Sequence, residues 1–203
     1  MRLFDGGRVP NARRVRIYLS EKGLSVPIAA VDLSKSEHRS GEYLAKNPLG
    51  RVPMLELDDG TVITESIAIC RYFEELHPTP PLFGTGALGK AQVEMWNRRA
   101  ELELYFAIQA VFRHLHPGMA TSEVPQVAAW GEVNKEKANA AMALLASQLA
   151  NNRFLAGEAY SVADITALVS VDFLKASKLA MPAHLTNLAR WHAEVSARPS
   201  AKA

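Results

Sequence analysis

The sequence has 203 residues, of which 48% are hydrophobic and 22% charged, with a formal net charge of +2. This composition is typical of one or two globular domains, excludes a disordered chain and gives no reason to expect nucleic-acid binding. The single cysteine, Cys70, excludes an intramolecular disulfide and favours a reducing, cytoplasmic compartment, and no stretch predicts a signal peptide or a membrane span.

Residues 1–80 predict a small mixed α/β domain. Gly6-Gly7 ends the first short strand, Gly23 is expected to be a helix C-cap, and Asp58-Asp59-Gly60 predicts a hairpin turn. Strands are expected at residues 2–4, 28–31, 54–57 and 62–63, and helices after Pro10 and at residues 65–76.

The remainder predicts an all-α domain. A stretch rich in proline and glycine follows His77, and we expect residues 81–86 to link residues 1–80 to a domain formed by residues 87–203. Helices are expected at residues 91–115, 127–149, 161–177 and 185–197. Ser161 and Asp164 have the spacing of a capping box, which we interpret as structural.

The first candidate binding segment is Arg51-Val52-Pro53. Proline at the start of a strand removes a donor from the ladder. If the Val52–Pro53 bond is cis, Val52 turns its main-chain groups outward, and a peptide ligand can pair with them as an added strand. A trans turn proline is the alternative that base rates favour.

The second candidate is Glu65-Ser66, where a strand passes into a helix. Helix N-terminal amides favour an anion, and the Ser66 hydroxyl adds a donor for a carboxylate. Glu65 can accept from an ammonium group, so the pair suits an α-amino-acid head. Ordinary helix capping is the alternative.

In combination these signals are specific. The run NPLGRVPMLELDDGTVITESIAICRYFEE, the segment FLAGEAYSVADIT and the two-part layout resemble the cytosolic glutathione transferase family over nearly the whole chain. The resemblance implies a thioredoxin-like N-terminal domain with a cis Val52–Pro53 bond, followed by an α-helical domain. It implies that Val52 pairs with the cysteinyl part of glutathione, that Glu65 and Ser66 hold the γ-glutamyl end, and that His38 and Arg51 are polar contacts. It also implies a homodimer.

The residue that would activate the glutathione thiol is less obvious. The family usually places Tyr, Ser or Cys just after the first strand, but residues 4–11 contain none of these. Arg8 could stabilise a thiolate by its charge beside a helix N-terminus, although it cannot act as a base near neutral pH.

Polar groups of the second domain offer another route. The segment NRRAELELYFAIQAVFRHLHPG resembles a yeast and bacterial branch of the family in which a water held by second-domain residues is thought to act. Gln109 and Arg113 stand at those polar positions, where a hydroxyl and a histidine are expected. Glutamine can orient a water but not deprotonate it, so His114 or His116 would be the base.

Three further residues or groups have simpler interpretations. Cys70, among apolar neighbours, is expected to be a buried inert thiol. The Arg13-Arg14-Arg16 cluster is expected to be a solvated helix face. Tyr105 and Phe112, with His116 nearby, are expected to line an apolar pocket for the second substrate.

The leading hypothesis is an enzyme, a glutathione transferase that uses glutathione as co-substrate, requires no metal and conjugates it to small hydrophobic electrophiles. A glutathione-dependent disulfide or peroxide reductase and a non-catalytic glutathione-binding module are the alternatives. The second-substrate pocket depends on loop shape and packing, so the sequence does not name the electrophile.

Overall fold

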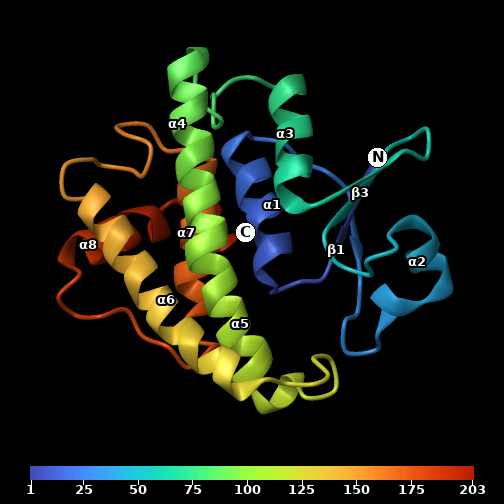
Figure 1. The fold of residues 1–203 in the computed structure, drawn as a ribbon. Helices are drawn as coiled ribbons and strands as arrows, with labels where there is room; N and C mark the ends of the chain where they lie inside the picture. Colours follow the sequence, from blue (N-terminus) through green and yellow to red (C-terminus); the bar gives the residue numbers. More distant parts are fainter. The chain divides into compact units, whose positions relative to one another are not determined.

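The computed structural model describes all residues 1–203, which form two compact units (Figure 1). The first unit consists of Met1–Leu82 with Pro199–Ala203, and the second consists of Phe83–Arg198. The division between Leu82 and Phe83 falls in the proline- and glycine-rich segment, and both side chains are buried. None of the helices combines the length and the hydropathy that a membrane-spanning helix requires.

The first unit is built on a four-stranded sheet in the order β2-β1-β3-β4. Its strands are β1 (Arg2–Asp5), β2 (Ile28–Ala30), β3 (Met54–Glu56) and β4 (Val62–Thr64). β2 is parallel to β1, and β3 is antiparallel to both β1 and β4. Helices α1 (Pro10–Glu21) and α3 (Ser66–Leu76) pack together, and α2 (Gly41–Lys46) lies on the other side of the sheet (Figure 1). The thioredoxin-like expectation is confirmed.

Local sequence signals explain where these elements begin and end. Pro10 opens α1, and Gly23 follows it at φ +64°. The Leu24 N–H donates to Leu19 O at 2.9 Å, which completes the expected glycine C-cap. Gly60, at φ +85°, forms the expected hairpin turn between β3 and β4.

Helix α2 is not predicted by the sequence. It spans only six residues and has too little apolar periodicity to be recognised. Ser40 caps it by accepting from the Tyr43 N–H at 3.2 Å. Its Tyr43 ring meets Phe4 edge-on at a centroid distance of 6.0 Å, so α2 covers the Phe4 and Met54 face of the sheet.

The second unit is helical. It contains α4 (Gly86–Arg99), the π-helical segment η2 (Ala100–Tyr105), α5 (Phe106–Leu115), α6 (Ala128–Gln148), α7 (Val162–Phe173) and α8 (Thr186–Ser196). Figure 1 shows α4 and α5 as one continuous rod. The expected helix therefore starts earlier than residue 91 and contains a π-helical turn, in which the Phe106 N–H donates to Glu101 O. Apolar residues on most sides of this helix hide that change of period.

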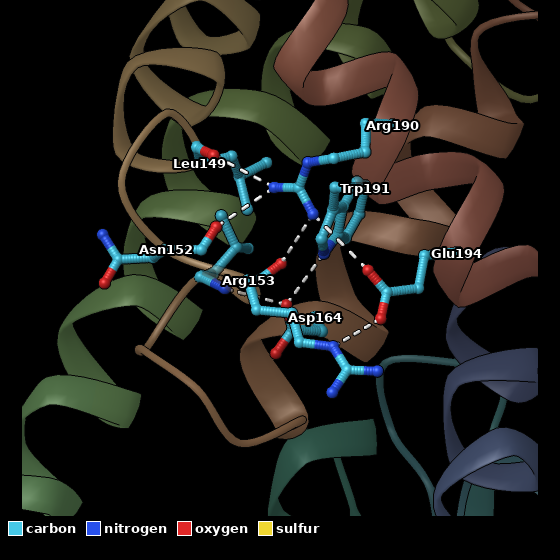
Figure 2. Close-up of polar contacts among 8 residues, drawn as sticks. Leu149, Asn152, Arg153, Asp164, Arg190, Trp191 and Glu194 are labelled. Carbon is cyan, nitrogen blue, oxygen red and sulfur yellow. Dashed lines mark hydrogen bonds and ion pairs between the residues drawn. The ribbon is translucent and has the colours of Figure 1, made fainter.

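Side chains of α7 and α8 form hydrogen bonds with the loop that connects α6 to α7. Asp164 accepts from the Ser161 N–H at 3.0 Å, which confirms the reciprocal half of the capping box. Arg190 donates to the carbonyl oxygens of Leu149 and Asn152 at 3.0 and 3.1 Å (Figure 2). The first bond satisfies the C-cap carbonyl of α6, which the helix itself leaves without a donor, and the second satisfies a carbonyl of the loop that follows.

Candidate functional site in the first unit and on helix α5

The register of the sheet brings three loop segments together. Phe4 pairs with Met54, and Met54 pairs with Thr64. Because β1 ends just after Phe4, β3 begins at Met54 and β4 ends at Thr64, the segments 6–8, 52–53 and 65–66 leave the sheet at the same end. The residues predicted to bind glutathione therefore gather beside the loop that carries Arg8.

The residue before Val52 is fixed by hydrogen bonds, whereas the main-chain groups of Val52 itself have no partner. The Val52–Pro53 bond is cis, as the resemblance implied. The carbonyl of Arg51 accepts from Tyr43 Oη and Asn47 Nδ2, both at 2.7 Å. Neither the N–H nor the C=O of Val52 forms a hydrogen bond, so both can pair with an extended peptide.

The loop between β1 and α1, which contains Gly6 and Arg8, lies directly against Val52. A Cβ added to Gly6 would lie 2.7 Å from Val52 Cγ2, so only glycine allows this approach. Asp5 shapes the loop by accepting from the Gly7 N–H at 2.6 Å and from Arg16 Nη1 at 2.5 Å. Arg8, at the loop's tip, is exposed and forms no hydrogen bond or ion pair, so its charge is available to a ligand.

Glu65 and Ser66 occupy the start of α3. Glu65 has φ 65° and ψ 119°, a conformation that costs a non-glycine residue free energy and often accompanies function. No side chain caps α3, so its first amides are open to an anion. The Glu65 side chain is exposed and Ser66 is buried, which places an acceptor for ammonium beside donors for carboxylate.

His38 lies on the other flank of the Arg51 segment. It belongs to the short 3-10 helix η1 (Glu37–Arg39). A Cβ added to Gly50 would come within 2.9 Å of the His38 carbonyl oxygen, so η1 packs against the residue before Arg51. Burial, with a smaller contribution from Arg39, lowers the pKa of His38. The neutral imidazole is therefore favoured at pH 7.

The expectation of a solvated arginine face on α1 is wrong. Arg14 is only 1% exposed, and its Nη1 donates to Ser66 Oγ at 3.0 Å. Arg16 pairs with Asp5, and Arg13 donates to the Ala201 carbonyl at 2.7 Å. The positions of charged residues in the sequence do not show which side of a helix faces a neighbouring element, so these partners could not be predicted.

In the second unit, helix α5 carries the candidate pocket residues. Phe112 lies 4.9 Å from His116 and 5.0 Å from Phe173, measured between ring centroids. Tyr105 lies 6.2 Å from Phe173, so Phe173 of α7 joins the three aromatic residues that the sequence predicts for the second-substrate pocket. Gln109 Nε2 donates weakly to Tyr105 Oη at 3.4 Å.

Sequence reasoning missed Phe173 because it lies about 60 residues further along the chain, in α7. No local motif marks it, and only the packing of α7 against α4 and η2, which lead directly into α5, brings it to Phe112. Tyr43 and Asn47 hold the Arg51 carbonyl and are close to it in the chain, but helix α2, which places them there, was not predicted from the sequence. A side chain that acts by holding a neighbour in place has no sequence signature of its own.

Arg113 and His114 bind the loop between α5 and α6. Arg113 Nη1 pairs with Glu123 Oε2 at 2.5 Å. His114 Nδ1 accepts from the Val127 N–H at 3.1 Å. This bond assigns the proton of neutral His114 to Nε2, which lies 3.8 Å from Glu123 Oε1. Neutral His114 therefore has no free lone pair for use as a base in this arrangement.

Comparison with known proteins agrees with this architecture. The glutathione S-transferase N-terminal domain family matches residues 10–76, and the glutathione S-transferase C-terminal domain family matches residues 126–199. Glutathione S-transferase 2 of Saccharomyces cerevisiae is 39% identical over 100% of this chain and 88% of its own length.

Solved structures of glutathione S-transferases also resemble this chain. A glutathione S-transferase domain-containing protein of Marinobacter aquaeolei is 42% identical with a TM-score of 0.95, covering 98% of this chain and 99% of that one. Gtt2 of Saccharomyces cerevisiae is 39% identical with a TM-score of 0.94, covering 100% and 99% of the two chains. The resemblance to a yeast and bacterial branch is therefore confirmed, and the chain belongs to the glutathione S-transferase family.

Proposed function

We propose that this protein is a glutathione transferase that joins the sulfur of glutathione to the electrophilic carbon of a small hydrophobic compound. The observation that carries this proposal is the convergence of the segments 6–8, 52–53 and 65–66 at one end of the sheet. The open main chain of Val52 suits the cysteinyl residue, and the head of α3 suits an α-amino-acid group.

Glutathione would lie across these segments in one direction. The γ-glutamyl ammonium would face the exposed carboxylate of Glu65, and its α-carboxylate would face Ser66 and the first amides of α3. The cysteinyl residue would pair with the main chain of Val52, beside Pro53. The glycyl end would lie towards Arg51 and His38, where Arg51 has an exposed, uncommitted side chain.

The reaction requires a thiolate, and a free thiol with a pKa near 8.5 is only a few per cent ionised at pH 7. Arg8 would stabilise the thiolate by charge, and the N-terminus of α1 would add to its effect. The thiolate then attacks the electrophilic carbon, a C–S bond forms, and the leaving group departs with the electron pair of the broken bond.

Gln109 and Arg113 are the proposed water-orienting residues of the second unit. His114 is the weaker candidate, since its Nδ1 is occupied by the Val127 N–H. Tyr105, Phe112 and His116 would contact the apolar part of the electrophile. We also propose the division of labour expected from the sequence, with residues 1–80 binding glutathione, residues 81–86 as linker and residues 87–203 supplying the second-substrate pocket in a cytoplasmic protein.

A homodimer is part of the proposal. Four exposed apolar side chains recur along the rod formed by α4, η2 and α5, at intervals that place them on a similar side: Leu88, Met95, Leu102 and Phe106. A second copy of the chain would cover them. Light scattering of the purified protein, with Met95→Glu and Leu102→Glu as disrupting variants, measures whether the dimer forms through this surface.

The central experiment combines binding with two activities. Calorimetry measures the dissociation constant for glutathione, and separate assays follow conjugation to an aryl halide and reduction of a mixed disulfide. We expect binding and conjugation. Glu65→Gln should weaken binding about 10- to 100-fold, because charge-assisted hydrogen bonds contribute about 1.5–3 kcal/mol. Glu75→Gln, at the exposed far end of α3, is the matched control.

The outcomes separate the hypotheses. Reduction without conjugation would favour the reductase alternative, and tight binding without either activity would favour a non-catalytic module. A wild-type protein that does not bind glutathione would overturn the proposal altogether.

A further inference from the structure

We propose that Arg14 is a positioning residue of the glutathione site, which holds the Ser66 hydroxyl so that its proton points towards the α-carboxylate of the γ-glutamyl group. This inference rests on the proposed function and deepens it. It assigns a role to a buried cation on α1 that neither the sequence motifs nor the segments at the end of the sheet include.

The position of Arg14 is unusual for its residue type. Arginine is almost never fully buried, yet Arg14 is 1% exposed. Its Nη1 lies 3.0 Å from Ser66 Oγ, and Ser66 is itself only 5% exposed. Burying a guanidinium costs substantial solvation free energy. The fold therefore keeps a full positive charge directly behind the first residue of α3.

The chemistry of the two groups determines which one donates. A guanidinium has five N–H donors and no acceptor, so Ser66 Oγ must be the acceptor in this bond. The hydroxyl proton of Ser66 cannot point at Arg14. It makes no other hydrogen bond in the structure, so it remains available for an acceptor at the open head of α3.

The charge of Arg14 adds an electrostatic preference to this orientation. Because the guanidinium is buried, its field is less screened by water and salt than that of a surface arginine. The uncapped N-terminus of α3 contributes positive potential at the same place. An anion is therefore favoured at Ser66, while the exposed carboxylate of Glu65 favours a cation next to it.

The two residues together would fix the orientation of the γ-glutamyl head. Its carboxylate is directed to Ser66 and its ammonium to Glu65, and the reversed arrangement would bring like charges together. Arg14 acts through Ser66 and the local potential, without touching the ligand. A purely structural arginine would affect all ligands of the site alike, whereas this role concerns the α-carboxylate alone.

The experiment compares glutathione with an analogue that lacks only the γ-glutamyl α-carboxylate. Calorimetry measures both dissociation constants for the wild-type protein and for Arg14→Met. We expect Arg14→Met to weaken glutathione binding about 10- to 100-fold, the range for one charge-assisted interaction, and to change analogue binding less than about twofold. In a Ser66→Ala background the same substitution should have a much smaller effect.

Arg13→Met is the matched control, because it removes the same charge from the same helix but faces Ala201. It should bind both ligands like the wild type. Circular dichroism and thermal melting without ligand report folding. If Arg14→Met does not fold, Arg14→Lys replaces it, and the loss of planar geometry should weaken glutathione binding about 3- to 10-fold while sparing the analogue.

The inference is overturned if the Arg14 variants weaken the binding of glutathione and of the analogue equally, or if they weaken the binding of neither. A wild-type protein that binds no glutathione instead overturns the proposed function, so the two failures are distinguishable.

Discussion

The indole nitrogen Nε1 of Trp191 donates a hydrogen bond of 2.9 Å to Asp164 Oδ1 inside the second unit (Figure 2). Both side chains are fully buried. Asp164 also accepts from the Leu155 N–H and from the N–H and hydroxyl of Ser161, at distances from 2.9 to 3.0 Å. One carboxylate thus joins α8, the start of α7 and the loop before it.

This arrangement predicts a large loss of stability when Asp164 is removed. Asp164→Ala should lower the free energy of unfolding by about 3–5 kcal/mol, because it leaves several buried donors without an acceptor. Trp191→Phe should cost about 1.5–3 kcal/mol, and the double variant should cost less than the sum. Urea denaturation measures each value. Additive losses would show that the hydrogen bond contributes nothing beyond the separate packing of the two residues.

Cys70 predicts a specific alkaline instability. Its thiol is fully buried, and burial raises its pKa far above the usual range. In the unfolded chain the thiol ionises near pH 8.5, whereas the folded chain keeps the proton. Stability should therefore fall as pH rises above about 8.5, by up to about 1.4 kcal/mol per pH unit from this group.

Denaturation at several values between pH 7 and pH 10 tests this dependence. Cys70→Ala should be less stable at pH 7 but should show a shallower alkaline decline. An aromatic disulfide reagent should find no reactive thiol in the native wild-type protein and one after unfolding. Rapid reaction of the native protein would contradict both the burial and the inert role of Cys70.

The proposed role of Arg8 predicts a change in the acidity of bound glutathione. Arg8→Ala should raise the pKa of the bound thiol by about one unit, since a neighbouring positive charge favours the thiolate. Ultraviolet absorbance of the thiolate, titrated against pH, measures this shift. Arg8→Lys should retain most of the effect, and Lys35→Ala, on an exposed turn of the same unit, serves as control. An unchanged pKa in Arg8→Ala would leave Gln109 and Arg113 as the proposed activating groups.

The ring contacts of Phe173 predict that it contributes to binding the second substrate and not to binding glutathione. Phe173→Ala should raise KM for a hydrophobic electrophile about 5- to 10-fold, because an aromatic contact contributes about 0.5–1.5 kcal/mol beyond the area it buries. The dissociation constant for glutathione should stay unchanged. Steady-state kinetics with Leu144→Ala, an exposed apolar residue of α6, as control would reveal any general effect of lost apolar surface. Equal loss in both variants would argue against Phe173 as a pocket residue.

Several features were predictable because their causes are local. Gly23 predicts a helix end and Asp59-Gly60 predicts a turn, because of their own backbone preferences. Asp164 predicts a capping box, because its partner Ser161 lies three residues away. The π-helical turn at Ala100–Tyr105 was not predictable, since helix packing and not residue type decides where a period changes.

Residue types and their spacing were enough to predict the mixed α/β and all-α halves, the family resemblance and the segments expected to bind glutathione, because periodicity and turn chemistry act over a few residues. The three-dimensional packing alone shows that Arg14 lies behind Ser66, that Phe173 contacts Phe112 and that the Val127 N–H occupies His114 Nδ1. Those contacts join residues on different elements. Burial and hydrogen-bond partners are set by how elements pack, which no local pattern of residues specifies.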